Sequence, residues 1–170
     1  MLSRRDVLLG LSGFALAPPA AIAAGGPERM LDFFSGRVVG EGVFSDLRKG
    51  KTRSVKAVLN GRKGTNSLIL TQDMAFSDGQ KEHRVWTFTS SGGRILGRRA
   101  DLIGDADIDV GDASAHIAYT ARTSVEGSTY SLKFDETLAF QGQKSASSMV
   151  RIKLLFIPVA EMTLSLRKVG

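Results

Sequence analysis

Hydrophobic and polar residues alternate along most of the chain after Arg37, and a period of two predicts β-strands with one face on a core. The clearest such strand is predicted over residues 129–141. Its apolar face carries Tyr130, Leu132, Phe134, Leu138 and Phe140.

Weaker alternations predict the other strands, about ten in all. Two of them have inward faces made by Leu68, Leu70, Met74 and Phe76, and by Val150, Ile152, Leu154 and Phe156. The others are predicted over residues 37–44, 53–60, 82–90, 94–99, 103–110, 114–125 and 162–167.

Turn signals such as Asn60-Gly61 and Asp78-Gly79 separate these strands, and no long helical run intervenes. A flat antiparallel sheet of this size leaves long unpaired edges, which closure into a barrel removes. The sequence therefore predicts an all-β fold, a single antiparallel barrel of about eight to ten strands. One short helix is predicted ahead of it over residues 27–34, because Pro27 suits a helix start and Gly36 suits the stop.

The first 23 residues have the features of an export signal. Arg4 and Arg5 precede an apolar run over residues 7–22, which contains a proline pair and ends in small residues. Since a membrane-spanning helix needs roughly 20 apolar residues, we expect cleavage after Ala23 and one domain over residues 24–170. The paired arginines favour the twin-arginine route, with a general secretory signal as the alternative. Either route makes the mature protein periplasmic.

The net charge indicates which kinds of partner the protein binds, and the cysteine content indicates how the fold is stabilised. The chain has 23 basic and 17 acidic residues, a net charge of +6, and no cysteine, so an exported domain of this kind relies on its core rather than on disulfides. The charge favours an anionic membrane surface and is too diffuse to predict nucleic-acid binding. Two basic turn clusters are either solvated loop charge or a rim that contacts anionic lipid. They are Arg48, Lys49, Lys51 and Arg53, and Arg62 with Lys63.

The residues that carry catalysis or bind metals are sparse. His83 and His116 fall on different predicted strands, and the acidic run from Asp105 to Asp112 alternates with apolar residues as a strand does, so no metal site is predicted. The residues after the predicted signal contain no Gly-x-Ser-x-Gly motif for a nucleophile. We therefore predict no catalytic residue and no cofactor.

Spaced short motifs run through the predicted domain. They are Phe33-Phe34-Ser35-Gly36, Gly40-Glu41-Gly42, Asp78-Gly79 with Arg84-Val85-Trp86, Ala100-Asp101-Leu102-Ile103-Gly104, and Gly111-Asp112-Ala113 with Tyr119. Together they resemble domain-of-unknown-function family 3833, a group of short bacterial envelope proteins. The resemblance implies an envelope location and a lipocalin-like barrel, and it implies no catalytic residue. Many members look like lipoproteins, whereas this chain has no cysteine for lipid attachment.

Glu136 is the most informative polar residue, because it lies in phase with Phe134 on an apolar face. An unpaired buried carboxylate is costly, so Glu136 must pair, take up a proton or face a wet cavity. Gln72 interrupts an apolar face in the same way, and Arg84, which shares a face with Trp86, is a candidate partner for Glu136. We predict that five residues bind a ligand: Glu136, Gln72, Arg84, Trp86 and Phe134. The alternatives are an internal salt bridge that only fixes the barrel, or a strand end where Glu136 is exposed.

The resulting hypothesis is a periplasmic, non-catalytic protein that binds or carries a lipid or another small hydrophobic molecule inside a lipocalin-like barrel. The alternative is an envelope structural or interaction protein whose barrel is packed solid. A pocket of several hundred Å³ would favour the first function, and a filled interior would favour the second.

Overall fold

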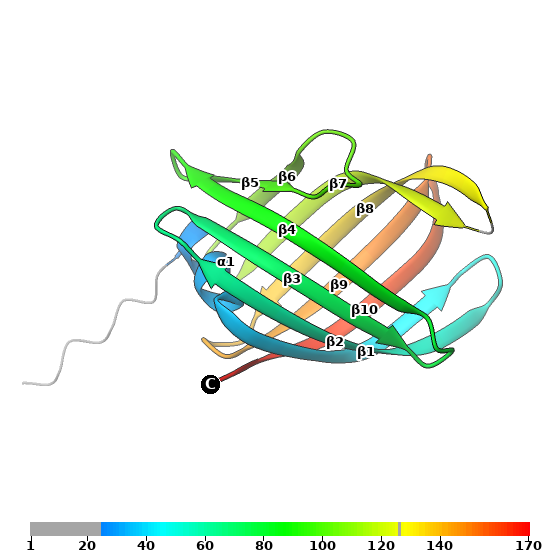
Figure 1. Cartoon of the computed structure of the whole chain (residues 1–170), viewed down its shortest axis with the longest axis horizontal. Coiled ribbons are helices and arrows are strands. Elements are labelled where there is room, and N and C mark those ends of the chain that lie inside the picture. The colour runs from blue at the N-terminus through cyan, green and yellow to red at the C-terminus, as the bar shows by residue number, and fades with distance from the viewer. Residues whose placement is uncertain (1–24, 126) are drawn as a thin grey trace, which may run out of the picture.

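The computed structural model describes residues 25–125 and 127–170, so the predicted signal over residues 1–23 lies outside the described residues. Within them, ten antiparallel strands close into a barrel, in the spatial order β1-β10-β9-β8-β7-β6-β5-β4-β3-β2 (Figure 1). The predicted antiparallel meander and its closure are both confirmed. No helix in the described residues is long and apolar enough to span a membrane.

One helix precedes the strands and has the bounds that the sequence predicts. The elements are α1 (Pro27–Phe34), β1 (Gly36–Asp46), β2 (Lys51–Lys63), β3 (Ser67–Phe76), β4 (Lys81–Ser91), β5 (Arg94–Arg98), β6 (Ala106–Val110), β7 (Ser114–Val125), β8 (Ser128–Phe140), β9 (Ser145–Leu154) and β10 (Ile157–Val169).

The barrel is closed by its first and last strands. β1 pairs with β10 from Arg37 opposite Val169 to Asp46 opposite Ala160, without interruption. The register between β9 and β10 shifts once, between Pro158 and Ala160. Every strand has two neighbours in this order, but β5 pairs with β4 only over residues 87–91, so the outer edge of β4 over residues 81–86 has no strand partner among the described residues.

Alternate side chains point into the barrel, as the period of two predicts. Phe134, Leu138 and Phe140 of β8 are buried, and so are Val150 and Ile152 of β9. These residues form one hydrophobic core with the inward residues of the other strands. The inward face of β8 is therefore confirmed from Leu132 onward, as is most of that of β9, whereas Tyr130, predicted on the same face, is 37% exposed near the start of β8.

Two further details of the prediction are wrong. Phe156, placed inward by the alternation, is 87% exposed, because β9 ends at Leu154 and the chain turns before Phe156. The strand predicted from residue 103 begins only at Ala106, because the preceding residues form a loop in which Leu102 makes a single bridge to Ala121.

The amphipathic helix α1 covers one end of the barrel, which we call the helix end. The ring of Phe33 packs edge-on against that of Phe140, 5.6 Å between centroids. Lys63 of β2 reaches the helix carboxylates, with its Nζ 2.8 Å from Glu28 and 2.5 Å from Asp32. These contacts fix α1 across the ends of β2 and β8.

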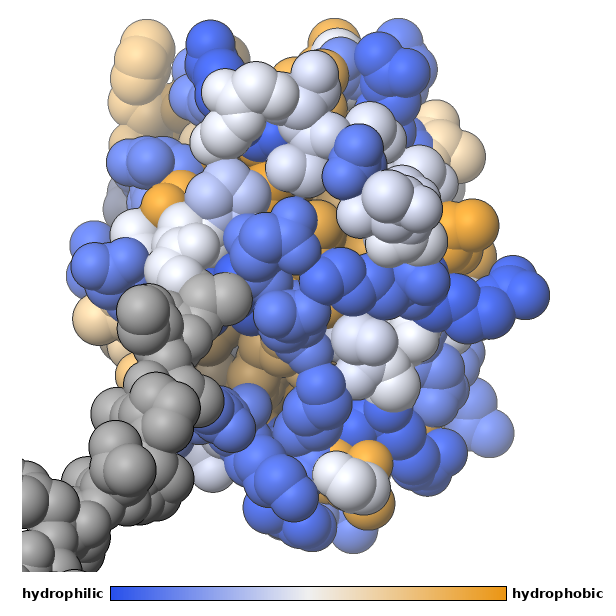
Figure 2. Space-filling view, turned by 90° about the vertical axis from the view of Figure 1, so that its left-hand side faces the viewer, coloured by the Kyte–Doolittle hydropathy of each residue, from blue (hydrophilic) through white to orange (hydrophobic). Residues whose placement is uncertain are grey.

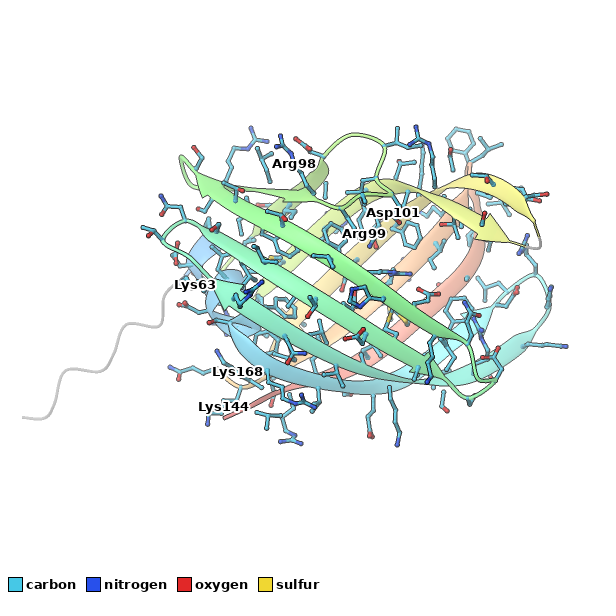
Figure 3. The ribbon with its side chains drawn as sticks, in the orientation of Figure 1. Lys63, Arg98, Arg99, Asp101, Lys144 and Lys168 are labelled. Atoms are coloured by element: carbon cyan, nitrogen blue, oxygen red, sulfur yellow. The ribbon has the colours of Figure 1, made fainter. Side chains whose placement is uncertain are left out.

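The surface of the helix end is mostly hydrophilic (Figure 2). Lys63, Lys144 and Lys168 all lie at this end (Figure 3). The opposite end, which we call the far end, carries the turns β1–β2, β3–β4, β7–β8 and β9–β10 (Figure 1).

Candidate functional site

The barrel encloses a small cavity that extends from its middle toward the far end. Its volume is about 50 Å³, which is enough for a few water molecules. Apolar side chains from strands around the barrel make up most of its wall, and a few polar groups converge among them. The lining residues are Phe44, Gln72, Met74, Phe76, Glu82, Arg84, Trp86, Tyr119, Phe134, Glu136, Val150, Ile152, Met162 and Leu164.

The five residues predicted from the sequence as ligand-binding all line this one cavity. Gln72 and Arg84 are direct cross-strand partners on β3 and β4. Glu136 and Phe134 come from β8, two residues apart on the same face, and Trp86 follows Arg84 by the same step on β4. Period-two alternation on three strands brings them together. Their role toward a ligand stays a prediction.

Aromatic rings form one side of the cavity. Phe134 stacks on Tyr119 at 4.7 Å between centroids, Tyr119 meets Trp86 edge-on at 5.2 Å, and Trp86 stacks on Phe88 at 5.3 Å. Such pairs contribute about 0.5–1.5 kcal/mol each beyond the area they bury. The ladder makes this wall stiff and places the single tryptophan of the chain beside the cavity.

Arg84 is not the ion-pair partner of Glu136. Its guanidinium pairs with Glu82 on the same strand, and this pair lies toward the far end of the cavity. The side-chain amide of Gln72 is directed to the sulfur of Met74 at 3.8 Å. The predicted pairing is therefore corrected: Arg84 acts on Glu136 through its charge and not through a direct contact.

Arg99, which the sequence did not single out, is the other charged residue of this region. Its side chain is only 4% exposed and pairs with Asp101, Nε to Oδ1 at 2.5 Å (Figure 3). The guanidinium lies over the rings of Trp86, at 4.5 Å, and Tyr119, at 5.1 Å. Its Nη1 is buried without a hydrogen-bond partner among the described residues. Leaving a buried hydrogen-bond donor without an acceptor costs free energy.

Arg99 could have been found from the sequence, because it is in phase with the buried Ile95 and Gly97 at the end of the strand predicted over residues 94–99, although β5 itself ends at Arg98. Ser148 could have been found, since it is in phase with Val150 and Ile152 on β9. It is buried, and its hydroxyl donates to Oε1 of Glu136 at 2.7 Å.

Glu136 is the unpaired charge of the cavity. Each arginine has its own carboxylate, whereas no described cation lies within ion-pair distance of Glu136. Burial raises the pKa of Glu136, and the Ser148 hydrogen bond with the charges of Arg84 and Arg99 opposes the rise without cancelling it. Burial, together with the charge of Glu136, raises the pKa of Tyr119 to about 12. The cavity therefore holds a carboxyl group that takes up a proton readily.

Replacing Glu136 by glutamine is expected to change how stability depends on pH. Because its pKa is raised on folding, the carboxyl stabilises the fold fully below its ordinary value of 4.5, and this contribution is lost as pH rises through the raised pKa. We expect Glu136→Gln to be more stable than the unchanged protein at neutral pH and to lose this advantage in acid. Urea unfolding across pH measures this, and a large loss of stability at neutral pH would mean that Glu136 is half of a structural ion pair.

The two histidines lie outside the cavity. Nδ1 of His83 lies 2.6 Å from Asp73, and Nε2 of His116 lies 2.8 Å from Asp135, both pairs among exposed side chains. Asp107, part of the acidic run, is exposed on β6. These residues take no part in the site.

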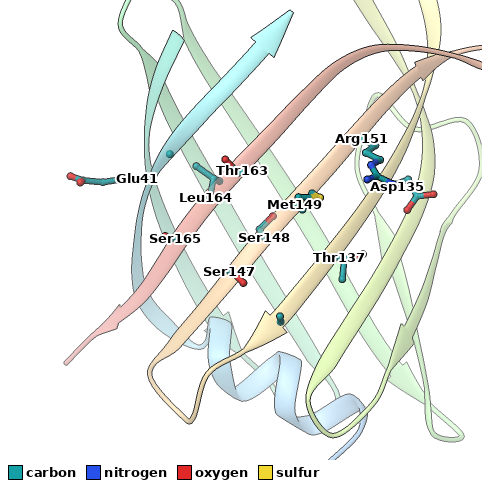
Figure 4. Close-up of a pocket in the computed structure, with 12 residues that line it drawn as sticks. Glu41, Asp135, Thr137, Ser147, Ser148, Met149, Arg151, Thr163, Leu164 and Ser165 are labelled. Carbon is teal, nitrogen blue, oxygen red and sulfur yellow. The ribbon is translucent and has the colours of Figure 1, made fainter. Parts of the chain in front are cut away.

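A larger hollow of about 430 Å³ lies on the outer wall across β8, β9, β10 and β1 (Figure 4). Small polar residues line it, among them Thr137, Ser147, Thr163 and Ser165. Despite its size, it is an open surface groove, and Ser148 is the one buried polar residue among those that line it. We therefore take the interior cavity as the candidate site, because buried polar groups with shifted pKa values meet there.

Comparison with known proteins gives a family. Residues 8–168 match the family described as "Protein of unknown function (DUF3833)". The chain belongs to this family. The resemblance predicted from its spaced motifs is thus confirmed. No curated protein matches this DUF3833 chain.

Solved structures with a similar fold include two barrels of different origin. The S-type phycobiliprotein lyase CPES from Guillardia theta is 9% identical with a TM-score of 0.52, over 85% of this chain and 94% of that one. A redesigned β-barrel, mFAP1, bound to DFHBI, is 11% identical with a TM-score of 0.47, over 82% and 99%. At such low identity, the similarity to the lyase shows only that this DUF3833 chain has the same type of fold, a lipocalin-like barrel.

Proposed function

We propose that the protein is a non-catalytic carrier of the bacterial periplasm that binds a lipid or another small hydrophobic molecule with a polar head inside its barrel. The observation that carries this proposal is the polar cluster inside the barrel. Glu136 lacks an ion-pair partner among the described residues, and Nη1 of Arg99 lacks a hydrogen-bond partner. Glu136 accepts a hydrogen bond from Ser148, so what it lacks is a counter-charge. Native cores pair their buried polar groups, and a carboxyl and a guanidinium that are only partly paired beside a cavity suit a ligand head.

The cavity must widen to hold such a ligand, because pockets for small molecules usually measure about 300–1,000 Å³. The far end is the route that the structure offers. Phe44 and Phe76 line the cavity there, and the guanidinium of Arg53 lies 4.6 and 4.5 Å from their ring centroids. Arg53 also binds Asp78 in the β3–β4 turn at 2.7 Å. Separation of this cluster would lengthen the cavity toward solvent.

Titration with fatty acids or phospholipids, followed by Trp86 emission, tests the proposal. Since Trp86 lines the cavity, we expect a saturable change with micromolar or tighter affinity, near −8 kcal/mol. Glu136→Gln is expected to alter the affinity or its pH dependence while the fold stays intact. The matched control is Asp135→Asn, which removes a carboxylate from the neighbouring, outward position and should leave the titration unchanged.

The small volume of the cavity favours one alternative, an envelope structural or interaction protein with a filled barrel. On that reading, no lipid changes Trp86 emission saturably, and native mass spectrometry of the purified protein finds no bound lipid. Those two results together would contradict the carrier function and support a structural protein with a filled barrel.

The periplasmic location has its own test. We expect the protein isolated from the periplasm to begin near Ala24, because small residues precede that position. Replacing Arg4 and Arg5 by lysine should block export if the twin-arginine route is used. Fractionation and N-terminal sequencing measure both outcomes, and normal export of the variant would point to the general secretory route.

A further inference from the structure

The turn between β9 and β10 exposes three consecutive large apolar side chains. Leu155, Phe156 and Ile157 are 69%, 87% and 67% exposed. Leu155 also has a positive φ of 56°, the one such value among the described non-glycine residues. A turn in solvent places glycine or asparagine at such a position. The turn thus combines a strained backbone with an exposed apolar tip, and a backbone outlier of this kind suggests a function.

A second apolar residue points from the same end. Leu47, in the β1–β2 turn, is 47% exposed, and its backbone N–H donates to the carbonyl of Val159 near the start of β10, at 3.0 Å. The apolar residues of the two turns therefore lie on neighbouring parts of the far end.

Basic side chains flank this apolar tip. Lys133 and Lys153 are cross-strand partners on β8 and β9, and Nζ of Lys133 lies 5.6 Å from the ring centroid of Phe156. Arg48 and Lys51 belong to the β1–β2 hairpin beside Leu47.

The acidic side chains beside these turns already have hydrogen-bond or ion-pair partners within the protein. Asp46 accepts the backbone N–H groups of Arg48 and Lys49, at 3.0 and 3.1 Å, and its Oδ1 lies 4.0 Å from Nε of Arg48, so it offsets the charge of Arg48. Glu161 pairs with Arg151 at 3.4 Å. The far end therefore presents an apolar tip with a positive border, in contrast to the hydrophilic helix end (Figure 2).

We propose that the far end docks on an anionic phospholipid membrane, with Leu155, Phe156 and Ile157 inserted at the level of the headgroups and the flanking basic side chains on the lipid phosphates. Apolar insertion combined with basic residues is the chemistry of peripheral membrane contact. The charge complementarity of the border favours lipid over a protein partner or a second copy of the chain. The proposal does not depend on whether the barrel holds a ligand.

A single environment-sensitive label tests this docking, because the chain has no cysteine of its own. Phe156→Cys places a fluorophore at the tip of the full chain. We expect a blue shift and a several-fold rise in emission with vesicles of phosphatidylcholine and phosphatidylglycerol. Labels at Val85→Cys on the outer wall and Gln143→Cys at the helix end are the controls and should stay unchanged.

Charge variants separate the electrostatic part. Replacing Lys133 and Lys153 by glutamine should weaken vesicle binding by about tenfold or more, and the same change at Lys56 and Lys144 should have little effect. Equal responses from all three labels, or none at residue 156, would overturn the proposal. An unchanged response with phosphatidylcholine alone would contradict the anionic preference. A label response that grows with protein concentration without vesicles would show self-association instead.

Discussion

Phe134→Ala is expected to lower the free energy of unfolding by about 3–5 kcal/mol, the usual loss for a fully buried phenylalanine. The Phe134 side chain is 6% exposed, lines the cavity and stacks on Tyr119 at 4.7 Å. Its removal enlarges a cavity that a closed barrel cannot collapse around. Urea unfolding followed by far-ultraviolet circular dichroism gives the value.

Phe156→Ala is the matched control, because the same atoms are lost from a ring that is 87% exposed. We expect its effect to stay within about 0.5 kcal/mol. If Phe134→Ala cost less than about 1 kcal/mol, the inward and outward faces of β8 would be reversed.

Gly42→Ala is expected to cost about 3 kcal/mol or more, at or above the upper end of the usual range for overpacking. A Cβ at Gly42 would lie 1.8 Å from the backbone oxygen of Thr163 and 2.9 Å from Cα of Leu164. Both atoms belong to β10, so the variant must push apart the two strands that close the barrel. Denaturant unfolding measures the loss, and the slope of the transition reports whether the remaining sheet is less compact.

Gly40→Ala serves as the comparison on the same strand. Its Cβ would meet Cδ2 of Leu166 at 2.7 Å, the end of a flexible side chain rather than backbone. We expect a smaller loss there, since that side chain can turn away. Equal losses at Gly40 and Gly42 would mean that the close approach of β1 and β10 is not what requires glycine.

The sequence was sufficient to predict the fold because the features that specify this barrel are local along the chain. Each strand carries its own alternation, and short turns leave few ways to connect neighbours. The cavity residues on strands, Gln72, Arg84 and Glu136, follow from the same alternation. Glycine at residue 42 has a steric cause that the alternation does not show, the nearby backbone of β10.

The rest of the site depends on what alternation does not encode. Arg99 is in phase with Ile95 and Gly97, but alternation does not predict its position over Trp86, because it lies just after the end of β5. Arg84 pairs with Glu82 rather than with Glu136, because Glu82 lies within reach of its side chain on the same strand. Phe156 was misplaced because no turn signal marks the end of β9, where apolar residues continue across the turn.

The pairing of β1 with β10 also constrains the order of events during synthesis. Until residues 157–169 have left the ribosome, the sheet is open and both of its outer strands have unpaired backbone groups. Contacts between the two ends of a chain form slowly, because a long loop must close first. A nascent chain is therefore expected to need protection from aggregation until its last strand is made. If a folded-protein export route is used, the docking of β10 sets the earliest moment at which the protein can leave the cytoplasm.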